Sequence, residues 1–154
     1  MSALLISTAV QASDCIVGYW FGSPKIEKQT DMTGFRFGLP GSSGGPVHLN
    51  GMEMSIFCSS TERIEGFQFT WCGPALAGDL SGLQLSLYNR VRNEANGVQL
   101  GVINGSYNEA DLQIGVINYA KKSAAFQLGA INYNPHGILP VSILFNFGSC
   151  SEAN

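Results

Sequence analysis

Four cysteines are the residues of this 154-residue chain whose chemistry is easiest to state. Cys58 and Cys72 occupy nearly equivalent places in successive repeats, so stacking of the repeats would set them one above the other as a disulfide. Cys15 and Cys150 form a second candidate pair. A bridge over so short a loop would contribute about 3 kcal/mol in an oxidising compartment. Zinc is the alternative, but the chain has no Cys-x-x-Cys and its spacings are unlike those of compact zinc sites, so we expect no metal.

A serine before Gly-Gly-Pro is the second candidate for chemistry. Ser43 and the glycine-rich segment 41–47 resemble the nucleophile loop of chymotrypsin-like serine proteases. That family needs a histidine and an aspartate well before the serine, whereas both histidines, His48 and His136, follow it, and Ser42 replaces the usual Asp. A hydrolase that uses Ser43, His136 and a carboxylate therefore stays as an alternative, and the expectation is that the protein is not an enzyme and has no cofactor.

The elements that must position these residues are repeats. Five glutamines return at nearly equal intervals, each between two apolar residues, and an asparagine follows the same period. The glutamines are Gln68, Gln84, Gln99, Gln113 and Gln127, and the asparagines are Asn89, Asn104, Asn118, Asn132 and Asn146. A nearly fixed period of this kind is typical of stacked repeat architectures.

The alternation within each repeat predicts strands. In the segment 98–104 apolar residues alternate with Gln99, Gly101 and Ile103, and the connectors 105–111 and 119–125 have the same length. Equal connectors favour parallel coils over hairpins, so we expect an all-β, single-domain β-solenoid with coils of about 14–17 residues. The alternative is a small antiparallel β-barrel or meander, because one strand of about 10 residues plus a turn has a similar length.

The same alternation assigns side chains to the two faces of each strand. We expect Val98, Leu100 and Val102 to fill the interior, together with a hydrogen-bonded ladder of Asn89, Asn104, Asn118 and Asn132. The opposite parity is expected to form an outward trough, with a glycine row at 101, 115 and 129 along its floor. This candidate binding face comprises Gln84, Gln99, Gln113, Gln127, Ile103, Ile117 and Ile131. Its expected partners are another protein, a polysaccharide or a second copy of the chain, with membrane contact only in the barrel alternative.

Composition excludes some functions. The net charge is −3 and Lys121-Lys122 is the largest cationic cluster, whereas nucleic-acid binding needs several cations on one face. Charged residues make up 12% and apolar residues 45% of the chain, which fits a β-rich protein with few exposed helices.

The N-terminal segment predicts export. Residues 3–12 have the apolar run and the small-residue end of a secretory signal, although the charged start of such a signal is missing. The expected organisation is a signal segment at 1–12, an N-terminal cap with irregular coils at 13–50, a repeat β domain at 51–147 and a tail at 148–154. The expected location is the periplasm, the cell surface or the extracellular space.

The motif Gly-Val-Gln-Leu-Gly-Val-Ile-Asn at 97–104 has copies at 111–118 and 125–132. It resembles the tandem G-[LV]-Q-[IL]-G-[LV]-[IV]-N units of bacterial surface-repeat proteins, and the resemblance covers about residues 66–147. Such proteins are mostly exported or surface-associated and of unknown function. The resemblance thus implies a location rather than an activity. From the sequence as a whole we expect a non-enzymatic exported protein that acts as a surface or periplasmic structural and binding module.

Overall fold

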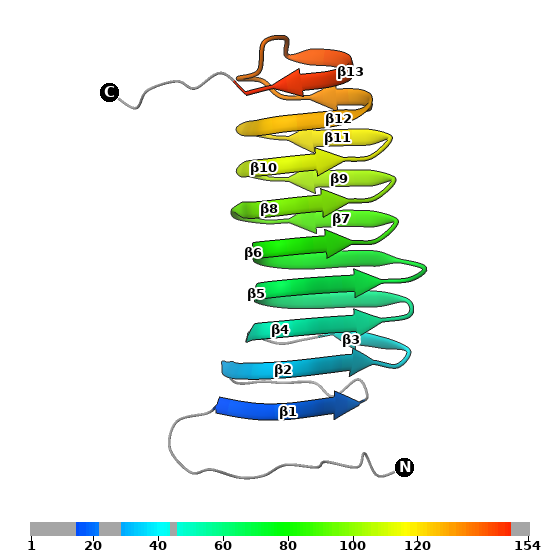
Figure 1. The fold of residues 1–154 in the computed structure, drawn as a ribbon, viewed down its shortest axis with the longest axis vertical. Coiled ribbons are helices and arrows are strands. Elements are labelled where there is room, and N and C mark those ends of the chain that lie inside the picture. Colours follow the sequence, from blue (N-terminus) through cyan, green and yellow to red (C-terminus); the bar gives the residue numbers. More distant parts are fainter. Residues whose placement is uncertain (1–14, 22–28, 44–45, 149–154) are drawn as a thin grey trace, which may run out of the picture.

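A computed structural model describes residues 15–21, 29–43 and 46–148, which form a β-solenoid of about seven turns with about 15 residues per turn. In Figure 1 the coils rise in chain order from β1 to β13. None of the described residues belongs to a helix long and apolar enough to cross a membrane. The strands are β1 (Cys15–Phe21), β2 (Thr30–Gly38), β3 (Gly41–Ser43), β4 (Val47–Ser55), β5 (Cys58–Thr70), β6 (Pro74–Leu85), β7 (Tyr88–Val91), β8 (Ala95–Leu100), β9 (Ile103–Ser106), β10 (Glu109–Ile114), β11 (Ile117–Ala120), β12 (Ser123–Tyr133) and β13 (Val141–Phe147).

The coil has two walls, which Figure 1 shows as strands that point in opposite directions. Wall A contains β1, β2, β4, β8, β10 and the longer parts of β5, β6 and β12; wall B contains β3, β7, β9, β11 and the remaining parts of β5, β6 and β12. All pairings from β1 to β12 are parallel, and β13 lies antiparallel on β12. The predicted solenoid is confirmed, and the antiparallel alternative is wrong.

The coils are longest near the N-terminal end of the stack and shortest near its C-terminal end. Arg36 pairs with Glu53 near the N-terminal end, whereas the more closely spaced Gln99 and Gln113 pair with each other farther along. The last shortening occurs between Ala110 and Leu112, where one residue of the previous coil has no counterpart. These offsets lie within the range of coil lengths that the repeats predict.

A corner between the walls changes the alternation of side chains. Strand β8 ends at Leu100 and β9 begins at Ile103, and both Val102 and Ile103 face outward with 45% and 37% of their surface exposed. Because two consecutive residues point outward, Gln99 and Asn104 both point inward, from opposite walls. The interpretation of 98–104 as one continuous strand is therefore wrong.

A glycine row divides the strands of wall A. Gly51, Gly66, Gly82 and Gly97 have φ between 133° and 141°, a region that L side chains rarely adopt. A Cβ at Gly82 would lie 2.1 Å from the carbonyl oxygen of Gly66 in the previous coil. We call the residues before this row the first half of wall A and those after it the second half, and residues of β10 and β12, which lack the glycine, belong to the half of their register partners in β8.

The apolar core lies behind the first half of wall A. Its column decreases in size along the stack, from methionine, leucine and isoleucine to alanine, and Val91 and Ala120 contribute from wall B. The column consists of Met32, Leu49, Ile64, Leu80, Ala95, Ala110 and Ala124, in register from coil to coil.

Candidate functional site

The interior behind the second half of wall A is polar. One inward side chain per coil forms what we call the glutamine column, in which every member has at most 1% of its surface exposed. Its members are Arg36, Glu53, Gln68, Gln84, Gln99, Gln113 and Gln127. Each glutamine Nε2 donates to the side-chain oxygen of the previous member at 2.7–2.9 Å. The prediction that Gln84, Gln99, Gln113 and Gln127 form an outward binding face is wrong, because these amides are buried in the glutamine column.

The glutamine column also connects the two walls. Gln84 Nε2 donates a second hydrogen bond to the Ala75 carbonyl at 2.9 Å, and Gln127 Nε2 donates to the Tyr133 carbonyl at 3.1 Å. A buried donor without a partner costs about 1–3 kcal/mol, whereas a formed bond contributes about 1 kcal/mol net. Bonds along the column and across the interior thus make a polar core stable.

The predicted asparagine ladder is present in the structure. Asn89, Asn104, Asn118 and Asn132 are fully buried, and each of the first three donates from Nδ2 to Oδ1 of the next at 2.8 Å. The same Nδ2 atoms also donate to backbone carbonyls near the corner, as Asn104 does to Ile114 at 2.8 Å. The N–H groups of this ladder point toward the C-terminal end, opposite to those of the glutamine column.

The glycines of the expected trough face inward instead. A Cβ at Gly115 would lie 2.3 Å from the Gly101 carbonyl oxygen and 2.6 Å from Asn104 Nδ2, and Gly129 has the same surroundings one coil later. The asparagine amides occupy the space where a side chain would be. The prediction of an outward trough along these glycines is therefore wrong, and the row exists because the ladder needs the room.

An ion pair ends the glutamine column near the N-terminus. Glu53 accepts hydrogen bonds from Thr61 Oγ1 at 2.7 Å, from Gln68 Nε2 at 2.8 Å and from Ser42 Oγ, and it pairs with Arg36 Nη1 at 3.2 Å. Burial lowers the pKa of Arg36, and the Glu53 carboxylate opposes this shift. Because Arg36 and Glu53 are both buried, each depends on the other for compensation of its charge.

The residues that flank this column point outward and form what we call the apolar face. Its first column is Phe35, Met52, Phe67, Leu83, Val98, Leu112 and Phe126, its second is Phe37, Met54, Phe69, Leu85, Leu100, Ile114 and Leu128, and Phe147 and Phe145 of β13 extend the two columns. These side chains are intermediate or exposed and partly cover one another, as the rings of Phe126 and Phe147 do at 4.9 Å. The signal that could have identified this face is the apolar-x-apolar pair around every glutamine.

The apolar face continues around the corner toward wall B. Ile103, Ile117 and Ile131 are 37%, 39% and 50% exposed, so the isoleucine part of the predicted face is at the surface as expected. Trp71 is 69% exposed and packs edge-on against Phe69. An apolar cleft of about 330 Å³ lies beside it, lined by Phe37, Met54, Ser55, Ile56, Phe69 and Trp71.

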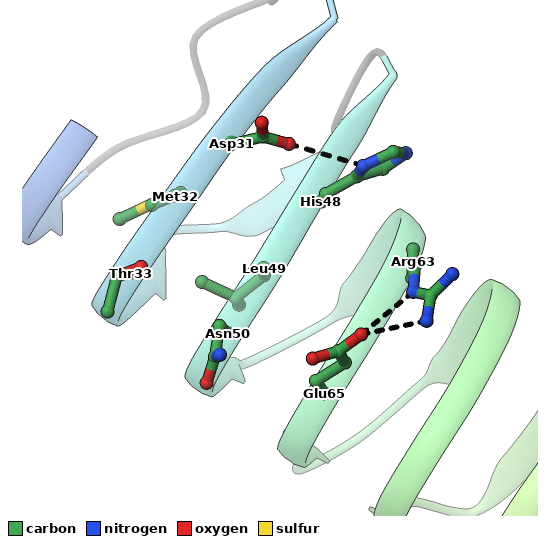
Figure 2. Close-up of a pocket in the computed structure, with 8 residues that line it drawn as sticks. All are labelled: Asp31, Met32, Thr33, His48, Leu49, Asn50, Arg63 and Glu65. Atoms are coloured by element: carbon green, nitrogen blue, oxygen red, sulfur yellow. Dashed lines mark hydrogen bonds and ion pairs between the residues drawn. The ribbon is translucent and has the colours of Figure 1, made fainter. Parts of the chain in front are cut away.

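The outer surface of the first half of wall A is polar and hollowed. Figure 2 shows this cleft of about 360 Å³, in which Asp31 Oδ1 lies 3.2 Å from His48 Nδ1 and Arg63 Nη2 lies 2.9 Å from Glu65 Oε1. Asp31 and His48 are register partners on β2 and β4, whereas Arg63 and Glu65 are two residues apart on β5. The cleft therefore has the charge pairing of an ordinary solvated β surface.

The structure does not bring the predicted hydrolase residues together. Ser43 ends β3 and its backbone pairs with Ser60, whereas His136 follows β12 and contacts the Lys122 carbonyl at 2.6 Å. Six steps of about 4.8 Å between β3 and β12 separate the two by about 29 Å. His48 lies on the outer surface of wall A, on the other side of the coil, and residues 44–45 lie outside the described residues.

Cys58 and Cys72 are free thiols, so the predicted disulfide between them is wrong. The coil at this point is longer than the interval between the two cysteines, because Ser59 pairs with Ala75, and the Cys72 N–H donates to the Ile56 carbonyl at 2.8 Å. Cys72 thus stacks over a residue before Cys58. Cys150, and with it the pair Cys15–Cys150, lies outside the described residues, as do the segment 1–12 and most of the tail.

In the part of the chain that the structure describes, no group of three or more His, Cys, Asp or Glu residues is placed to hold a metal ion. The shape and chemistry of the apolar face are thus the main indications of function that the described residues provide. Comparisons of the chain with protein-family models, with curated proteins and with solved structures found no match.

Proposed function

We propose that the chain is a non-enzymatic, exported repeat protein that acts as a surface or periplasmic structural and binding module, and that the apolar face is its docking surface. The signal-like residues 3–12 and the repeated motif at 97–104 support the export part of the proposal. The apolar face supports the binding part, and it is the single observation on which the proposal depends.

The extent of the apolar face is what distinguishes it from scattered surface residues. Eight rungs from β2 to β13 contribute to it. At about 4.8 Å between strands and about 3.3 Å per residue, the area from the first column to the corner measures about 34 Å by about 13 Å, or roughly 440 Å² in outline. Contiguous apolar patches of a few hundred Å² mark interaction sites on soluble proteins.

The interior makes this face rigid. The inward residue in the second half of wall A is an amide bonded to the coils above and below and to wall B, as Gln84 is. Side chains that are already ordered lose little conformational entropy when a partner binds. The buried glutamine column thus holds a flat apolar surface ready for docking.

The other expected uses have less support. A polysaccharide along the glutamines would need exposed amides, and those amides are buried. The serine hydrolase alternative would need Ser43 near His136, and about 29 Å separates them at about 4.8 Å per coil.

Retention on a phenyl-agarose column at low salt, with the chain loaded at a dilution high enough to keep it monomeric and its apolar face free, tests the docking surface. The face variant Leu85→Glu/Leu100→Glu changes two outward residues that are register partners on β6 and β8. Its matched control is Ser81→Glu/Asn96→Glu, which adds the same charge to register partners on the same strands, across the glycine row. We expect the unchanged chain and the control to be retained and the face variant to elute early; equal elution of the two variants would refute the proposal.

Export has its own test. Expression of the full chain in a bacterial host, followed by fractionation and N-terminal sequencing, should find the protein outside the cytoplasm with Ser13 as its first residue. A cytoplasmic chain that retains residues 1–12 would contradict this part of the proposal.

A further inference from the structure

We propose that the partner of the apolar face is a second copy of this chain, with the two faces packed against each other. This inference rests on the proposed function, because it names the occupant of the same docking surface.

The area of the face suits such a pair. A flat outline of roughly 440 Å² corresponds to a larger accessible surface, because the side chains of each rung project from the sheet. Beyond the corner, the exposed side chains of Ile103, Ile117 and Ile131 add a further apolar strip that this outline does not include. Two copies together then reach the lower end of the roughly 1,200–2,000 Å² that stable protein interfaces bury in total.

The distribution of charge favours a second copy over a lipid surface. Anionic membranes attract clusters of Lys and Arg, whereas this chain carries a net charge of −3 and its largest cationic cluster is Lys121-Lys122. The charged side chains of wall A in Figure 2, such as Asp31 and Glu65, lie in the first half, outside the apolar face. Two apolar faces can therefore meet without bringing like charges into contact.

The regularity of the face favours a copy over an unrelated protein. Its columns remain in register through successive coils, so two copies present the same strand spacing to each other. Sheets pack face to face about 10 Å apart when their side chains interdigitate, and equal spacing allows this along the whole face. A two-fold axis in the plane of the interface makes such a contact self-complementary and closed at the dimer.

Sedimentation equilibrium of the full chain between about 1 and 100 µM tests the proposal, in the range where typical interfaces of this size associate. We expect the unchanged chain and the control Ser81→Glu/Asn96→Glu to sediment as dimers. The face variant Leu85→Glu/Leu100→Glu should be a monomer throughout, with an affinity at least about 100-fold weaker. If this variant fails to give a native far-UV circular dichroism spectrum, Leu85→Ser/Leu100→Ser replaces it with the same expected direction.

The results separate this inference from the proposed function. A chain that stays monomeric across the whole concentration range but is retained on phenyl-agarose overturns the second-copy proposal and leaves the docking surface intact. A monomer that is not retained overturns both. A monomer that sediments with vesicles of phosphatidylcholine and phosphatidylglycerol overturns the second copy in favour of lipid, and a dimer that persists in the face variant overturns it by placing the interface elsewhere.

Discussion

The two halves of wall A bury opposite kinds of side chain. In the first half, Leu49, Ile64 and Leu80 are buried while charged residues such as Arg63 face solvent. In the second half, the glutamine column is buried and the apolar face lies outside. Both halves belong to the same strands, and from β2 to β8 one glycine in each strand separates them. A strand can therefore bury its polar side chains when every coil supplies the partner that the next one needs.

The comparison also shows why the inverted half suits a repeat protein. A single buried glutamine must find partners of a different kind, whereas a stacked column supplies an identical amide at the strand spacing. Gln99 illustrates this, because it donates to Gln84 and accepts from Gln113. The polar interior in turn leaves the apolar residues of the same strand outside, where they form the docking surface.

The largest effect is expected where the glutamine column meets a charge. Arg36→Gln or Glu53→Gln alone should lower the free energy of unfolding by about 3–5 kcal/mol, because each leaves a buried charge without its partner. The double variant Arg36→Gln/Glu53→Gln should recover most of this loss, because it extends the column of neutral amides by two coils. A double-mutant cycle by urea unfolding measures the coupling, and additive losses would contradict the role of the ion pair.

Replacement of a central glutamine with an apolar residue tests whether the second half of wall A needs its buried amides for stability. Gln99→Leu removes the N–H that donates to Gln84 and the oxygen that accepts from Gln113. We therefore expect the free energy of unfolding to fall by about 2–4 kcal/mol, even though the new side chain is apolar and of similar size. Leu80→Ala, in the conventional half, should cost about 2–5 kcal/mol through the cavity that it leaves. Urea unfolding of both variants checks this, and a Gln99→Leu variant as stable as the parent would show that the amides are not needed.

A smaller effect on stability is expected at Gly115, whose backbone packs against the asparagine ladder. Gly115→Ala should destabilise the protein by about 1–3 kcal/mol, because its Cβ would collide with the Gly101 carbonyl and Asn104 Nδ2. Gly105→Ala is the control, since a Cβ there meets its nearest heavy atom, the Asn89 carbonyl oxygen, at 3.7 Å. Thermal unfolding of the two variants should differ clearly, and equal melting temperatures would contradict the packing of the ladder.

The smallest effect is expected on the apolar face itself. Leu100→Thr should change the free energy of unfolding of the monomer by no more than about 0.5 kcal/mol, because the side chain projects outward. Leu80→Thr, which places a hydroxyl in the conventional core, should cost several times as much. Chemical unfolding at sub-micromolar protein concentration makes the comparison, and a large loss for Leu100→Thr would mean that the face is part of the core.

The sequence by itself determined the coil and one of its two polar columns. The period of the glutamines and asparagines predicted parallel stacking, and Asn89, Asn104 and Asn118 bond to the next asparagine as expected. These features depend on spacing along the chain, which a sequence displays directly. The isoleucines at the corner were also placed at the surface, because their exposure follows from the same repeat.

Only the tertiary structure decided which side of each strand faces the interior. Alternation separates Gln99 from Leu100 but does not say which is buried, and the usual burial of apolar residues gave the wrong answer in the second half of wall A. Two outward residues at the corner, Val102 and Ile103, bring the glutamines and asparagines to the same interior from opposite walls. The sequence also did not reveal the small changes in coil length that keep Cys58 and Cys72 from stacking on each other. Stacking depends on which residues are register partners in neighbouring coils rather than on distance along the chain.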